Sequence, residues 1–327
     1  MIITTKEIAQ ICGVSRGTVD RALNNKPGIN SKTKEEILRV AKEHGYSPNH
    51  VGRSLAKGKT FSLGVIVFDF KNQYFSQMLN AIEMQTRENG FALLIMMSEK
   101  NVELEKKAIR SLYDRRIDGI ILHPVGFDKA YEKFLKRINI PIVTLGNHLS
   151  DAYDYISIDN HQAGYEAVLH IEHHGYEQIV FIAPPLRKKN IENISAQEER
   201  RDGYLKAMSE VGLEPLVIGD KGYINQAFDL ISSASHRIAF LCSSDAFALE
   251  LMKAIRKSEF NLSDVGIMGF DRIEMLDYIV PKLSTVFNPI EETGVTAVDR
   301  LIKRIEKPEM KPQTITIKHE IVVGETL

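Results

Sequence analysis

Two arginines near the N-terminus, Arg16 and Arg21, lie in a segment that is rich in positive charge. Residues 1–60 carry a formal charge of +6, whereas the remaining 267 residues carry −7. Arginine is the side chain that most often recognises guanine in the major groove, and clustered cations attract DNA phosphates. A basic segment on an acidic body is typical of a nucleic-acid reader joined to a domain that does not bind DNA.

A second pair of side chains, Arg200 and Asp271, suggests a different chemistry. An arginine and a carboxylate that face one cleft can bind neighbouring sugar hydroxyls through charge-assisted hydrogen bonds. The alternative for this pair is a salt bridge between two lobes, without a ligand.

Two short helices around a tight turn must position the N-terminal arginines. We expect Thr5 to cap the first helix, with Ile8 and Ile11 facing inward, and Gly13 to supply the turn. Ser15 then caps the second helix.

The second helix is predicted to expose its basic side chains. Val14 and Val19 flank the cap at the spacing of a hydrophobic staple, so Val19 faces inward. Arg16, Gly17 and Arg21 then point outward from the first turns, as in a recognition helix. A third helix should follow, with its N-cap at Asn30 and its end at Gly45. Its inward-facing residues are expected to be Ile37, Val40 and Ala41.

From residue 61 onward, buried apolar strands alternate with amphipathic helices such as 77–89, which is typical of parallel α/β layers. The pattern occurs twice, so two similar lobes are predicted. Their expected strands are 63–68, 91–97, 119–122 and 142–145, then 179–183, 216–218, 239–242 and 265–269. A ligand of such a fold lies between the lobes, at the carboxyl ends of the strands. Side chains placed there include Tyr74, Phe75, His123, Asn147, Ser244 and Asp271.

The N-terminal motifs closely resemble those of the lactose/galactose repressor (LacI/GalR) family, and the likeness continues almost to the end of the chain. The matching residues are Thr5-Lys6-Glu7-Ile8-Ala9, Gly13-Val14-Ser15, Thr18-Val19, Arg21-Ala22-Leu23-Asn24, Gly45-Tyr46-Ser47-Pro48-Asn49 and Arg53-Ser54-Leu55. The resemblance implies a small all-α helix-turn-helix head and an α/β periplasmic-binding-protein-like core of two doubly wound lobes. We expect a DNA-binding domain at 1–46, a hinge helix and linker at 47–60, and an effector-binding and dimerisation domain at 61–327.

This resemblance also implies the partners. The protein is expected to be a homodimeric transcriptional regulator, and more specifically a repressor, that binds a pseudo-palindromic operator. A small effector, a sugar or sugar derivative, would control its operator affinity. The residues expected at the DNA are Thr5, Ser15, Arg16, Gly17, Thr18, Arg21, Asn24, Arg53 and Leu55, the last as a wedge in the minor groove.

Two residues of the head depart from the family pattern. Asp20 stands where a serine is usual, and it could pair with Arg16 or accept a hydrogen bond from a cytosine amino group. Gly52 stands in the hinge where alanine is usual.

In the core, the family pattern favours the same ligand candidates. They are Tyr74, Phe75, His123, Asn147, Arg200, Lys221, Ser244 and Asp271. Gly146 occupies a place that is often aspartate, and Lys221 one that often carries an aromatic ring. Together with Arg200 and the run Arg187-Lys188-Lys189, Lys221 makes an acidic or phosphorylated sugar conceivable.

Other chemistry finds little support. His170, His173 and His174 have helical spacing, but no cysteine or carboxylate motif accompanies them, so we expect no metal. No phosphate loop, dinucleotide fingerprint or nucleophile elbow is present, so neither a cofactor nor catalysis is expected. No apolar run could span a membrane and no secretory signal is evident, so a cytoplasmic protein without a membrane partner is expected.

The alternative function is a solute-binding protein of a sugar transport system, which would explain the core but not the head. The sequence leaves open the identity of the effector, the operator, and whether the effector releases DNA or promotes its binding. It also leaves open an oligomer beyond the dimer, although no leucine heptad tail follows Val323.

Overall fold

The computed structural model describes residues 3–46, 58–183, 191–219 and 221–327. The chain divides into two compact units, Met1–Thr60 and Phe61–Leu327. In the described residues, none of the helices combines the length and apolar character that crossing a membrane requires.

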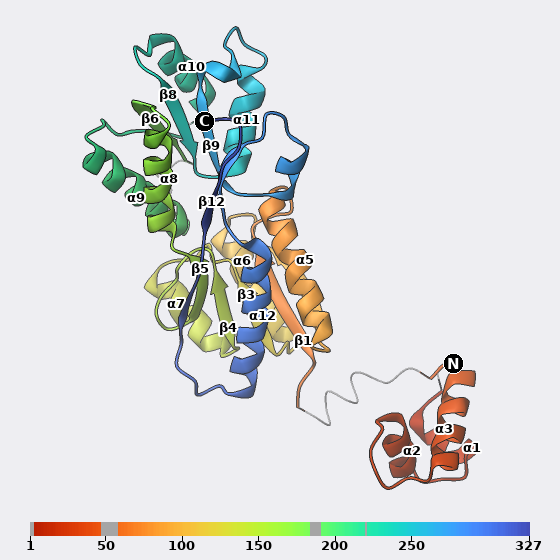
Figure 1. Ribbon diagram of the computed structural model, residues 1–327. Coiled ribbons are helices and arrows are strands. Elements are labelled where there is room, and N and C mark those ends of the chain that lie inside the picture. Colours follow the sequence, from red (N-terminus) through yellow and green to blue (C-terminus); the bar gives the residue numbers. More distant parts are fainter. Residues whose placement is uncertain (1–2, 47–57, 184–190, 220) are drawn as a thin grey trace. The chain divides into compact units, whose positions relative to one another are not determined.

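Three helices form the N-terminal unit: α1 (Thr5–Ile11), α2 (Arg16–Leu23) and α3 (Ser31–Glu43) (Figure 1). Their small apolar core contains Ile8, Ala9, Val19, Ala22, Ile37, Val40 and Ala41. Ile11, which was expected to face inward, is 53% exposed, so that prediction is wrong.

The second unit contains two α/β lobes, each built on a six-stranded sheet (Figure 1). In lobe one the strand order is β11-β5-β4-β3-β1-β2, and in lobe two it is β12-β10-β9-β8-β6-β7. All neighbouring strands are parallel except β10 and β12. The predicted fold class is therefore confirmed.

Lobe one contains the following elements: β1 (Ser62–Val67), α5 (Gln73–Glu88), β2 (Ala92–Met97), α6 (Val102–Asp114), β3 (Gly119–Leu122), α7 (Lys129–Ile138), β4 (Ile142–Leu145), β5 (Asp154–Ile158), α12 (Ile290–Glu306) and β11 (Thr314–Ile317). Its strands β3, β4 and β5 are buried along their whole length, because helices cover both faces of a parallel sheet.

Lobe two contains α8 (Asn160–His173), β6 (Gln178–Ile182), α9 (Ser195–Val211), β7 (Leu216–Ile218), α10 (Tyr223–Ser233), β8 (Ile238–Cys242), α11 (Asp245–Ile255), β9 (Gly266–Asp271), β10 (Ser284–Phe287) and β12 (Glu320–Val322), with short 3-10 helices η2 (Leu262–Asp264) and η3 (Glu274–Tyr278). In the described residues, the chain passes between the lobes three times: after β5, after β10 and after β11. The strands predicted from the sequence lie within two residues of the observed ones.

The helix predicted at 77–89 begins earlier, at Gln73. Asn72 caps it, because its side-chain oxygen accepts a hydrogen bond from the backbone N–H of Tyr74 at 3.1 Å. Tyr74 and Phe75 therefore lie in the first turn of α5 instead of the preceding loop, and both side chains are buried.

Candidate functional site

The first helix of the head is capped by Thr4, and not by Thr5 as expected. Thr4 Oγ1 accepts a hydrogen bond from the N–H of Glu7 at 3.3 Å, and Glu7 Oε2 accepts one from the N–H of Thr4 at 2.7 Å. This reciprocal capping box satisfies two backbone donors. Thr5 becomes the first helical residue, half-buried.

Ser15 caps α2 as predicted, accepting a hydrogen bond from the N–H of Thr18 at 3.1 Å. The hydroxyl groups of Ser15 and Thr18 also bond each other at 2.9 Å. Arg16, Gly17 and Arg21 are exposed, on the helix whose Val19 and Ala22 face the core; the structure thus leaves the two expected reader arginines free to contact DNA.

Asp20 does not pair with Arg16. Its carboxylate binds the ammonium of Lys26 at 2.8 Å and accepts a hydrogen bond from the side-chain amide of Asn24, also at 2.8 Å. The hydrogen bond from Lys26 holds the pKa of Asp20 below its usual value. The amide of Asn24 is thus engaged within the head, although its side chain is exposed. The hinge residues Gly52, Arg53 and Leu55 lie outside the described residues.

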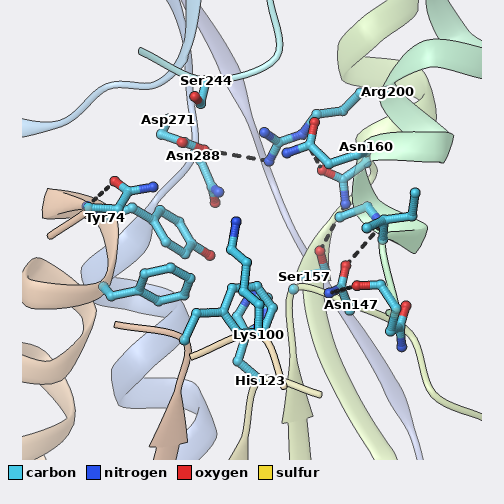
Figure 2. A pocket seen from close by; sticks show the side chains of 18 of the residues that line it. Tyr74, Lys100, His123, Asn147, Ser157, Asn160, Arg200, Ser244, Asp271 and Asn288 are labelled. Carbon is cyan, nitrogen blue, oxygen red and sulfur yellow. Dashed lines mark hydrogen bonds and ion pairs between the residues drawn. The ribbon is translucent and has the colours of Figure 1, made fainter. Parts of the chain in front are cut away.

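A pocket of about 160 Å³ lies between the two lobes of the second unit. Side chains from lobe one and lobe two both line it, as Figure 2 shows. Tyr74, Phe75, His123, Asn147, Arg200, Ser244 and Asp271 are among the lining residues, so seven of the eight expected ligand residues meet there. A cavity of about 150 Å³ is enough to hold one six-membered ring.

Arg200, on α9, is buried and almost fully held by lobe two. Its Nε–H donates to Asn160 Oδ1 at 2.9 Å, and its Nη1 donates to the carbonyl of Ser243 at 2.7 Å. Nη2 lies 3.5 Å from Asp271 Oδ1, and the guanidinium stacks 3.6 Å from the centre of the Phe270 ring. A guanidinium has five N–H bonds, so two have no partner among the residues that the structure describes and can bind a ligand.

Asp271 is the last residue of β9, in the same lobe as Arg200, so the ion pair lies within lobe two and does not join the lobes. Burial raises the pKa of Asp271 to about 6, although the positive charge of Arg200 acts in the opposite direction. Because the Arg200–Asp271 distance is long, a bridging hydroxyl group can accept a hydrogen bond from Arg200 and donate one to Asp271. The side chain of Asn288 interacts with both Asp271 and Tyr74.

Aromatic rings form the lobe-one wall. Phe75 and His123 meet edge to face with centroids 5.2 Å apart, and Phe68 lies 4.4 Å from His123. Burial lowers the pKa of His123 to about 3, so its imidazole is neutral at physiological pH. Its Nδ1 is buried and has no hydrogen-bond partner in the described part of the chain.

Gly146, where the family often has aspartate, lies against His123. A Cβ atom on Gly146 would lie 2.3 Å from Nε2 of His123, and the backbone φ of +66° is one that glycine favours. The imidazole therefore occupies the space that a side chain at position 146 would take.

Asn147 lines the pocket, but its amide chiefly joins the two lobes. Its Nδ2 donates to the carbonyl of Asn193 at 2.7 Å, and its Oδ1 accepts from the N–H of Ala196 at 3.2 Å. Ser244 lies at the N-cap position of α11 without a side-chain capping hydrogen bond, and it lines the pocket.

Lys221 is exposed and does not line this pocket, so the structure does not bring it to the site. The run Arg187-Lys188-Lys189 lies outside the described residues.

The sequence analysis missed several lining residues. Lys100, Asn160 and Asn288 follow β2, β5 and β10, so the carboxyl-end rule could have found all three. Two of these strands were not recognised from the sequence. In the described residues, no group of three or more His, Cys, Asp or Glu side chains could hold a metal ion.

Comparison with known proteins places both units in one family. Residues 60–324 match the periplasmic binding proteins and sugar binding domain of the LacI family, and residues 4–49 match the bacterial regulatory proteins of the lacI family. The HTH-type transcriptional repressor PurR of Vibrio campbellii is 28% identical and covers 99% of this chain and 98% of its own length. The ribose operon repressor of Halalkalibacterium halodurans is 27% identical, covering 99% of this chain and 96% of its own.

A crystal structure of the lac repressor dimer bound to operator and the anti-inducer ONPF has the same fold. It superposes with a TM-score of 0.86 at 24% identity and covers 100% of this chain and 99% of that one. The resemblance inferred from the head motifs is confirmed by these matches. The chain belongs to the LacI family of bacterial regulatory proteins.

Proposed function

We propose that this regulator represses transcription as a homodimer on a pseudo-palindromic operator, and that a small carbohydrate bound between its lobes changes its operator affinity. The observation that carries the proposal is the pocket, which both lobes line, in a chain that also has a helix-turn-helix head. A transport protein would have no use for such a head.

The lining chemistry suits a carbohydrate. Arg200 has two N–H bonds without a partner among the described residues, and each carboxylate oxygen of Asp271 can accept more than one hydrogen bond, so together they can bind adjacent hydroxyl groups. Ser244 adds a further hydroxyl group from lobe two. Tyr74 and Phe75 offer ring surfaces against which the C–H face of a sugar can pack.

Exposed apolar side chains support the dimer. Strand β2 is an edge strand of its sheet, and Ile95 and Met97 on it are each 42% exposed. In lobe two, Tyr278 and Val280 are 86% and 77% exposed. Large apolar groups of this kind on a surface mark interaction sites, and the structurally similar lac repressor was crystallised as a dimer.

Signalling follows from the position of the pocket. A ligand that touches both lobes favours one lobe arrangement over another by the difference in its affinity for the two. In the sequence, the head is followed directly by lobe one. A change in the distance between the two lobe-one domains of a dimer would therefore alter the distance between the two heads. We propose that the hinge, with Leu55 as a minor-groove wedge, transmits this change.

Arg16 and Arg21 are the proposed base readers. The test is operator binding by the full-length protein at several salt concentrations, using DNA selected from a random pool by the protein itself. We expect Arg21→Ala to cost about 1–3 kcal/mol on the selected site and much less on random DNA.

The matched control is Arg39→Ala in the same head. Arg39 is exposed on α3 and engaged by Glu36 at 2.7 Å and Glu43 at 2.6 Å, so its loss should leave operator preference unchanged. Equal losses of Arg21→Ala on both DNAs would make Arg21 a phosphate contact, and failure to select any DNA would refute the proposed function.

A further inference from the structure

Lys100 is a pocket cation that the sequence pattern did not single out. It follows β2 and points into the pocket between the lobes, as Figure 2 shows. Its ammonium lies 5.5 Å from the centre of the Phe68 ring. In the described part of the chain, no carboxylate forms an ion pair with it and no acceptor is hydrogen-bonded to it.

The lobe-one wall offers Lys100 no compensating charge. Among its described lining residues there is no aspartate or glutamate, and the position where the family often has aspartate is Gly146, closed off by His123. The two lining acids, Glu192 and Asp271, belong to lobe two, and Asp271 is paired with Arg200.

The charges of both cations, Lys100 on lobe one and Arg200 on lobe two, act on His123. After burial, the charges of Lys100 and then of Arg200 are what lower the pKa of this imidazole. A ligand that fills the pocket therefore lies between Lys100 on lobe one and Arg200 on lobe two, where two free guanidinium N–H bonds remain.

We infer that the effector is an anionic monosaccharide, whose carboxylate or phosphate group binds Lys100 while its hydroxyl groups bind Arg200 and Asp271. This inference rests on the proposed function of the pocket. A hydroxyl group of a neutral sugar would give the ammonium of Lys100 an uncharged acceptor in place of water, whereas an anion supplies an acceptor of opposite charge, which binds the ammonium more strongly. Lys100 thus selects the charge of the effector and, because the anion bridges from lobe one to lobe two, it also favours closure.

The experiment is calorimetric titration of the full-length protein with matched sugars. The sets are D-glucose, D-glucuronate and glucose 6-phosphate, then D-galactose, D-galacturonate and galactose 6-phosphate, then D-ribose and ribose 5-phosphate. We expect one anionic member to bind at least about tenfold more tightly than its neutral partner, and less tightly as salt is raised. The carboxylate and phosphate arms identify which anion is bound.

Three variants assign the preference to Lys100. Lys100→Met keeps the length of the side chain and should lower the affinity for the anionic sugar at least about tenfold. Lys100→Arg should retain the preference for the anion. Lys107→Met removes the same charge from an exposed position in lobe one that does not line the pocket. This control should leave the affinity for the anionic sugar unchanged. Lys100 is exposed, so the thermal midpoint of Lys100→Met should match that of the wild type.

Two results would overturn the inference while leaving the proposed function intact: neutral sugars binding as tightly as their anionic partners, or Lys100→Met binding the anion as well as Lys107→Met does. Binding of neither class would overturn the inference together with the carbohydrate pocket itself.

Discussion

Replacing Gly203 by alanine tests how α8 holds the arginine helix α9. A Cβ atom on Gly203 would lie 1.9 Å from the carbonyl oxygen of His161 and 2.9 Å from the backbone nitrogen of Tyr165. On the facing helix, a Cβ atom on Gly164 would lie 2.3 Å from the carbonyl oxygen of Arg200. The two helices therefore touch backbone to backbone, and no side chain can rotate away to relieve the contact.

Two effects of this substitution oppose each other. Helix propensity alone predicts that alanine stabilises the helix by about 1 kcal/mol. The contact of 1.9 Å, however, is more than 1 Å shorter than the 3.0 Å below which Cβ contacts essentially do not occur, so α8 and α9 must separate. Overpacking of this kind costs about 1–3 kcal/mol, and since the obstacle is backbone we expect a net loss near the upper end.

Urea unfolding of the full-length protein, followed by circular dichroism, measures this loss. Ser209→Ala, on the exposed face of the same helix, is the matched control and should change the free energy of unfolding by less than about 0.5 kcal/mol. Because Arg200 lies one turn before Gly203, the Gly203 variant should also bind the effector more weakly. A Gly203→Ala protein that is about 1 kcal/mol more stable than the wild type would refute the close contact.

Three further outcomes are expected. Burial raises the pKa of Glu105 from 4.5 to about 7, so the folded state keeps a proton that the unfolded state releases. The free energy of unfolding should therefore fall as the pH rises through 7. Replacing Glu105 by glutamine should reduce this fall by roughly 3 kcal/mol. Unfolding in urea at pH 5 and pH 8 measures it, and an unchanged difference between the two would contradict the assignment. Asp271→Asn retains an acceptor for Arg200, so its operator affinity without effector should equal that of the wild type, whereas its response to effector should be lost. Gel shifts with and without saturating ligand measure this response, and a full response would show that Asp271 is only structural. Thr4→Ala removes the capping box with Glu7 and should speed amide exchange throughout α1, in keeping with a loss of about 1 kcal/mol, whereas unchanged exchange would show the cap to be unimportant.

The sequence by itself determined the classes of structure, because the signals for them are local. Strands buried on both faces are largely apolar runs, so β3 and β4 were predicted at their observed bounds. Ser15 and Asn30 are N-caps because their short side chains reach the first free N–H groups of the following helix. The same local rule misassigned Thr5, because Thr4 beside it has the same side chain and only Thr4 has Glu7 three residues later.

Only the tertiary structure decided which side chains meet. Asp20 binds Lys26 beyond the end of its helix, and no helical spacing could have indicated that partner. Lys100 and Lys221 both lie in loops of the second unit, but of the two only Lys100 lines the pocket. Arg200 and Asp271 are 71 residues apart and meet through the packing of α9 against the sheet of lobe two. Periodicity depends on neighbours along the chain, whereas a pocket between lobes depends on strand order and helix packing, which bring distant residues together.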